Sequence, residues 1–149
     1  MIKHIAIVII SSLLSTMAIA SDSLISLKSA HSVTETANRF ESLLKEKGLT
    51  VFTRINHQEN AENINQKLAP TQVIIFGNPK VGTPLMQCSK TVAIDLPQKA
   101  LIWQDQQQQV WLSFNNPDYL KARHNIQGCE KVLTKIFGVL TKLGQAATK

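Results

Sequence analysis

The sequence predicts an α/β fold of the α+β kind, a two-layer sandwich in which two long helices cover one face of a mixed sheet of about five strands. Three observations lead to this prediction. Two long segments carry apolar residues at helical spacing, five short segments have the composition of strands, and the two kinds alternate along the chain. The chain has 149 residues, 44% of them hydrophobic and 17% charged, which fits one globular domain and excludes a disordered or multidomain protein.

The first strand and helix are predicted from alternation and from a helix cap. Residues 24–29 alternate like a strand. Ser32 and Glu35 form a capping box, in which each side chain satisfies a free backbone amide of the other residue, so a helix begins here. Apolar residues at helical spacing continue to Gly48, a residue type that ends helices. Residues 49–55 alternate and are rich in β-branched side chains, which predicts a second strand.

The middle of the chain predicts two short helices around a buried strand. Residues 58–68 are polar with a thin apolar stripe, which indicates a short surface helix ended by Pro70. Residues 73–76 are an uninterrupted apolar run, typical of a strand that is buried on both faces and central in its sheet. A turn at Asn78-Pro79 follows, and residues 81–88 predict a second short helix.

The last third of the domain predicts a hairpin and a long helix. Residues 99–104 and 110–114 form the two arms, joined by a glutamine-rich tip, and Asn116-Pro117 ends the second arm. Apolar residues recur every three or four positions over residues 125–143, which makes this the strongest helix of the chain. Its lysines are expected on the opposite, solvated face: Lys131, Lys135 and Lys142.

The N-terminus has the order of a secretory signal peptide. A short basic region, an apolar run over residues 5–14 and the small-residue stretch Ala18-Ile19-Ala20 precede a polar segment. We therefore expect residues 1–20 to be removed and residues 21–149 to form a single soluble domain that is periplasmic or secreted. The alternative is a membrane anchor, but the apolar run is too short to cross about 30 Å of hydrocarbon. No later stretch reaches that length, so no membrane span is expected after cleavage.

Charge and the two cysteines restrict the remaining function classes. The formal net charge is +6, but the lysines are scattered, which favours a solvated surface and no nucleic-acid partner. Cys88 and Cys129 are an even pair in an oxidising compartment and favour one disulfide. The alternative is two buried thiols that pack as small apolar side chains. A redox centre is not favoured because the chain has no C-x-x-C pair.

Several short motifs share a specific combined spacing. They are the capped first helix with Gly48 and Val51-Phe52, then Ile55-Asn56-His57 with Ala61, Phe76-Gly77-Asn78-Pro79 with Gly82-Thr83 and Leu85-Met86, and Asp95-Leu96-Pro97 with Lys99. Together they resemble the family named domain of unknown function 302 over nearly all of the mature chain. The resemblance implies a small α/β domain, often a dimer, whose activity is not established. One departure is Gln98, where the resemblance implies an apolar residue.

Four polar residues at predicted strand ends are the candidate ligand-binding residues. His57 follows the second strand, Asn78 follows the third, and Asp95 and Lys99 flank the start of the fourth. If these ends converge, the four side chains border one cleft that suits an anionic or polar small molecule. Each also has a structural interpretation, since Asn-Pro starts turns, an aspartate caps them, and a lone histidine or lysine is commonly a surface residue.

No motif in the sequence indicates a particular reaction. The sequence has no phosphate loop, no nucleophile elbow and no histidine or cysteine spacing for a metal, so no cofactor, no metal and no catalytic residue are assigned. The favoured function is a non-catalytic module that binds a small ligand or a partner. The alternative is a small acid/base enzyme that uses His57 and Asp95. Hairpin aromatics (Trp103, Trp111 and Phe114) on an uncovered sheet face favour a homodimer.

Overall fold

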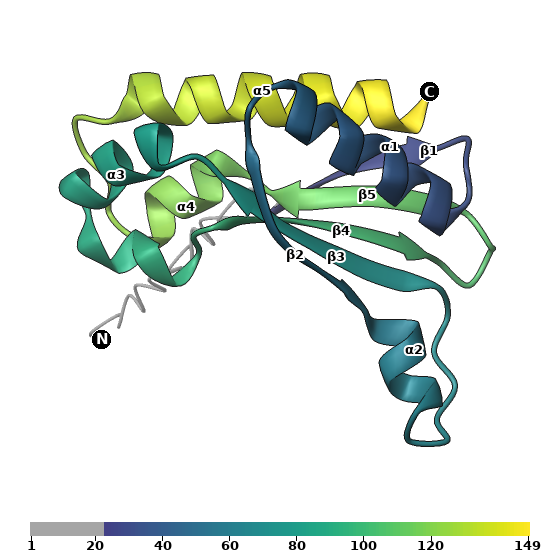
Figure 1. Cartoon of the computed structure of the whole chain (residues 1–149). Helices are drawn as coiled ribbons and strands as arrows, with labels where there is room; N and C mark the ends of the chain where they lie inside the picture. Colours follow the sequence, from purple (N-terminus) through teal and green to yellow (C-terminus); the bar gives the residue numbers. More distant parts are fainter. Residues whose placement is uncertain (1–22) are drawn as a thin grey trace, which may run out of the picture.

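The structure is a computed structural model that describes residues 23–149, so the predicted signal peptide over residues 1–20 lies outside the described residues. A five-stranded sheet forms one layer and the long helices lie against one of its faces (Figure 1). The strands are β1 (Leu24–Ser29), β2 (Thr50–Asn56), β3 (Thr71–Gly77), β4 (Gln98–Gln104) and β5 (Val110–Asn115). The helices are α1 (Val33–Glu46), α2 (His57–Glu62), α3 (Pro79–Cys88), the 3₁₀ helix η1 (Lys90–Ile94), α4 (Pro117–Arg123) and α5 (Glu130–Thr148). The predicted α+β sandwich is confirmed.

The sheet is antiparallel throughout, so the prediction of a mixed sheet is wrong. The strand order is β1-β5-β4-β3-β2, and all four neighbouring pairs run in opposite directions. A parallel pair needs a crossover between neighbouring strands. Here the one long crossover, through α1, joins β1 to β2, which lie at opposite edges of the sheet and never pair.

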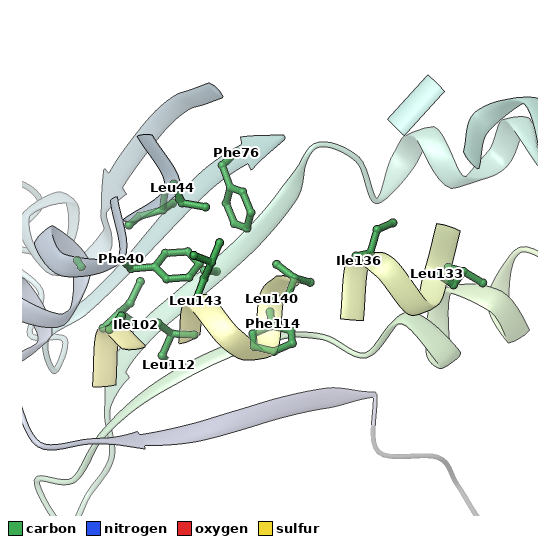
Figure 2. Close-up of a cluster of buried hydrophobic side chains, with 14 of the residues drawn as sticks. Phe40, Leu44, Phe76, Ile102, Leu112, Phe114, Leu133, Ile136, Leu140 and Leu143 are labelled. Carbon is green, nitrogen blue, oxygen red and sulfur yellow. The ribbon is translucent and has the colours of Figure 1, made fainter. Parts of the chain in front are cut away.

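Both long helices form where the apolar spacing predicts them, and α1 also has the predicted ends. Ser32 caps α1 by accepting a hydrogen bond from the backbone N–H of Glu35 at 3.2 Å, and Gly48 takes the left-handed conformation at φ +68°. The core lies between these helices and the sheet. Figure 2 shows Leu140 and Leu143 of α5 near Phe40 and Phe76, whose rings meet edge to face at 5.5 Å.

Two helix boundaries and the burial of one strand differ from the prediction. The short helix α2 ends at Glu62 rather than residue 68, and Asn65 has φ 57°, which a helix cannot accommodate. Helix α5 begins at Glu130 rather than residue 125, because Gly128 at φ +77° separates it from the preceding segment. Alternate residues of β3 are buried and half-buried, so this strand is not buried equally on both faces.

Helix α4 and the 3₁₀ helix η1 are absent from the sequence-based prediction. The pair Asn116-Pro117, interpreted as a strand breaker, also starts α4. Asn116 Oδ1 accepts a hydrogen bond from the backbone N–H of Asp118 at 3.0 Å, and Pro117 occupies the first turn. The same two residue types therefore end a strand and begin a helix.

A disulfide joins the helical segments at one end of the molecule. Cys88, the last residue of α3, is bonded to Cys129, which immediately precedes α5. This confirms the predicted pairing. Within residues 23–149, none of the helices has the length and apolar character needed to span a bilayer.

Candidate functional site

A cavity of about 630 Å³ lies between α3, α5 and one end of the sheet. The end of β3 and the start of β4 meet at this end of the sheet, because Phe76 pairs with Gln98 in the antiparallel register. The walls are mostly apolar, with contributions from all three sides: Leu49, Phe76, Val81, Met86, Ile136 and Val139. A cavity of this size and lining is typical of sites for small organic molecules.

A β-bulge places an aromatic side chain on this cavity. The pairing of β2 with β3 shifts register between Val51 and Thr53, and the residue between them, Phe52, lines the cavity. Bulges redirect side chains and commonly lie beside functional sites. Phe52 is 55% exposed, and a Cβ atom added to Gly77 would lie 3.5 Å from its ring. Phe52 therefore stands where the cavity meets solvent.

Three lysines and one glutamine are among the polar residues of the lining. Lys47, Lys135 and Lys142 line the cavity and are solvent-exposed, so they lie at its rim. Gln98 is only 8% exposed, and its Nε2 atom is buried with no hydrogen-bond partner among the described residues. The lining includes no aspartate or glutamate. The cavity is thus apolar inside, with one unpaired amide and a positively charged rim.

Of the four predicted ligand-binding residues, Asn78 alone lines the cavity. Its side-chain oxygen accepts a hydrogen bond from the backbone N–H of Lys80 at 2.9 Å and caps α3. Because α3 supplies one wall of the cavity, the cap also fixes the position of that wall. Asn78 thus bonds its own backbone segment, as its structural interpretation predicts, but it does so as a helix cap rather than in a turn, and it also lines the cavity.

His57 lies at the other end of the sheet, so the predicted convergence of the strand ends is wrong for this residue. In the β2–β3 pair, Asn56 faces Gln72 whereas Thr50 faces Gly77. His57 and Asn78 are therefore separated by the length of a strand, about 20 Å. The physical reason is the antiparallel pairing, which places the carboxyl ends of β2 and β3 at opposite ends of the sheet. An acid/base pair of His57 and Asp95 has no geometric basis.

Asp95 and Lys99 do lie together, but their contacts are internal. The Lys99 ammonium donates to the backbone oxygens of Asp95 and Pro97 at 3.2 and 3.1 Å. The Asp95 carboxylate lies 2.6 Å from His124 Nε2 and 3.2 Å from Arg123 Nη1. Neither Asp95 nor Lys99 lines the cavity.

His124 is a buried polar residue whose contacts the sequence did not indicate. Its side chain is 4% exposed, and its Nδ1 atom lies 3.0 Å from the hydroxyl of Thr91. The His124 imidazole thus lies between the hydroxyl of Thr91 and the carboxylate of Asp95. The same order of groups is found where a hydroxyl is activated as a nucleophile. None of the three lines the cavity, and this row of groups connects η1 to the end of α4. We therefore interpret it as a structural connection.

The face of the sheet opposite the long helices carries the hairpin tryptophans. Trp103 and Trp111 are half-buried, and their indole N–H groups donate to Ser113 at 3.0 Å and to Asp105 at 2.7 Å. The hydrogen bond from Trp111 holds the pKa of Asp105 below its ordinary value. Phe114, by contrast, points into the core, so it does not contribute to an apolar patch on this face.

No group of three or more histidine, cysteine, aspartate or glutamate side chains within residues 23–149 is arranged to hold a metal ion. The two polar features that distinguish the cavity were missed by sequence reasoning. The sequence predicts Lys135 and Lys142 on a solvated helix face, which agrees with their exposure but does not indicate that they lie beside the cavity. For Gln98, the departure from the family resemblance is the signal that the sequence offers.

Comparison with known proteins gives a family and a fold. The family described as "Domain of unknown function DUF302" matches residues 25–143. The crystal structure of an uncharacterized conserved DUF302 protein from Bacillus stearothermophilus superimposes with a TM-score of 0.77 at 17% sequence identity, covering 85% of this chain and 99% of that one. This likeness agrees with the antiparallel α+β fold described above.

Curated relatives carry a different description. The fluoride-specific ion channel FluC 1 of Brucella suis biovar 1 is 45% identical over 103 residues, which is 69% of this chain and 41% of that protein. The fluoride-specific ion channel FluC 2 of Brucella melitensis biotype 1 is also 45% identical over 103 residues, 38% of its length. This chain therefore spans about two fifths of the curated relatives that it matches.

Proposed function

The chain belongs to the DUF302 family. We propose that it is a binding module whose small ligand occupies the cavity between α3, α5 and the sheet. The observation that carries the proposal is the cavity itself, with a volume of about 630 Å³ and apolar walls. When a ligand fills this cavity, each part of its apolar surface that leaves water makes the free energy of binding more favourable. Asn78 is the one predicted ligand-binding residue that we retain, because it lines this cavity.

The proposal includes export. The N-terminal pattern of a signal peptide and the Cys88–Cys129 disulfide both suit an oxidising compartment. A homodimer through the uncovered sheet face is part of the same proposal, supported by the half-buried Trp103 and Trp111 on that face.

Filling the cavity is expected to abolish ligand binding without unfolding the protein. Val139 lines the cavity from α5 and is half-buried, so Val139→Trp places a bulky ring in the space that the ligand would use. The affinity for 1-anilinonaphthalene-8-sulfonate, an apolar dye with one negative charge, is expected to fall at least tenfold. Fluorescence titration measures it, and thermal unfolding shows that the variant is folded.

The matched control for this experiment is Lys131→Trp. Lys131 is exposed on the same helix and does not line the cavity, so this change adds an equal ring elsewhere and is expected to leave the dye affinity unchanged. Equal binding by the wild type and by a folded Val139→Trp variant would contradict the proposal.

The curated relatives support a second candidate, in which the chain acts beside a fluoride channel. The similar region covers only 38–41% of those proteins, so more than half of each protein described as a channel lies outside it. We infer that a domain joined to a channel in one protein works beside that channel when it is a separate chain.

Adding this protein is expected to change fluoride efflux from vesicles that contain the channel part of the Brucella suis relative, and the two are expected to co-purify. A fluoride-selective electrode measures the rate with the wild type and with Val139→Trp, the latter showing whether the cavity takes part. An unchanged rate together with no co-purification excludes this candidate.

A further inference from the structure

We propose that the ligand is an anionic amphiphile, a medium-chain carboxylic acid with a hydroxyl group on its chain, and that Gln98 selects the hydroxyl. This inference rests on the function proposed above and names the substrate class of the same cavity. Three features of the lining carry it: the charge of the rim, the apolar walls, and the buried amide.

The lysines at the rim of the cavity favour a ligand with a negative charge. Lys47, Lys135 and Lys142 line the cavity, and within residues 23–149 none of them forms an ion pair. Lys135 and Lys142 are seven residues apart on α5, which places them on one side of the helix about 10 Å from each other. No carboxylate in the lining opposes them. An acid group bound between these ammonium groups gains attraction and stays solvated.

The walls beyond the rim select an apolar chain. Ile136 and Val139 of α5 line the cavity together with Val81 and Met86 of α3, and Phe76 of β3 also lines it. These side chains offer no hydrogen bond of importance, so the ligand portion between them is hydrocarbon. Methionine among them adapts to irregular shapes, which suits an alkyl chain.

The buried amide selects a hydroxyl. Gln98 lies on the helix-covered face of β4, in register with Phe76, and its buried Nε2 atom has no hydrogen-bond partner among residues 23–149. A buried polar group without a hydrogen bond is costly, and a ligand that supplies the partner recovers that cost. A glutamine amide can turn over, presenting either its donor or its acceptor. A hydroxyl group satisfies both, because it donates and accepts.

The test measures binding of decanol, decanoate and the positional isomers of hydroxydecanoate by calorimetry. We expect decanoate to bind more tightly than decanol, and at least one hydroxydecanoate isomer to bind about tenfold more tightly than decanoate. In Gln98→Leu, which keeps the size of the side chain and removes its amide, the preference for the hydroxyl is expected to vanish while decanoate binds as well or better. The same variant is expected to have a higher Tm without ligand, because the unpaired amide is gone.

The lysines are tested by Lys135→Gln together with Lys142→Gln, with Lys131→Gln as the control on the same helix. The double variant is expected to lose about fivefold in affinity for decanoate but none for decanol, and the control is expected to lose neither. If the dye used above binds but no isomer is preferred, or Gln98→Leu keeps the preference, this inference is overturned and the proposed function stands. If neither dye nor acid binds, both fail.

Discussion

Replacing both Cys88 and Cys129 with serine is expected to lower the free energy of unfolding by about 4 kcal/mol. The disulfide joins residues 41 positions apart, and a cross-link of that span removes a large part of the conformational freedom of the unfolded chain. The measurement is equilibrium unfolding in urea. Reduced wild-type protein is the matched control, because it loses the bond and keeps both side chains.

The same variant is expected to bind cavity ligands more weakly. Cys88 ends α3 and Cys129 precedes α5, and both helices supply residues that line the cavity. Without the bond, α3 is held by its own packing, in which Leu85 is its one buried residue. A stability equal to that of the oxidised wild type would contradict the prediction, and unchanged dye affinity would show that packing alone fixes the wall.

The features that the sequence could predict depend on neighbours in the chain. Ser32 and Glu35 are three residues apart and form a cap wherever the helix lies in the fold. The helix stop at Gly48 and the apolar spacing of α1 and α5 likewise depend only on residues that are close in the sequence. The disulfide could be predicted because only two cysteines exist, so pairing required no choice of partner.

Strand direction could not be predicted in this way, and neither could the position of His57 relative to the other candidate residues. Whether β2 and β3 run parallel or antiparallel depends on pairing between distant segments, and that pairing decides where His57 lies relative to Asn78. Polar residues at the ends of several strands predict a site only where those strand ends are known to lie at the same end of the sheet. Asn116 illustrates a second difficulty, because its side chain suits both a turn and a helix cap.

The cavity was hidden because most of its lining has the composition of a core. Ile136, Leu140 and Leu143 line it and are also buried residues of α5, so their spacing predicts burial whether they face a protein side chain or a ligand. Gln98 is the exception. A polar residue on the buried face of a strand is expected to have a hydrogen-bond partner, but the predicted strand begins at residue 99 and leaves Gln98 outside it, so only the structure shows this conflict.

Replacing Asp95 with alanine is expected to lower the free energy of unfolding by about 3 kcal/mol. Replacing His57 with alanine is expected to change the same free energy by less than about 0.5 kcal/mol. Both were candidate ligand residues, and the structure separates them. The Asp95 carboxylate lies 2.6 Å from His124 and 3.2 Å from Arg123. Its loss leaves the imidazole of His124 buried without that partner, while His57 is exposed at the start of α2.

A double-mutant cycle isolates the contact between Asp95 and His124. Asp95→Ala, His124→Ala and the double variant are compared by urea unfolding, and a coupling free energy of about 1–3 kcal/mol is expected because the side chains share one hydrogen bond. Dye affinity is expected to be unchanged in every variant that remains folded, since neither residue lines the cavity. A folded Asp95→Ala protein with wild-type stability and lost dye binding would reverse this assignment and return Asp95 to the binding site.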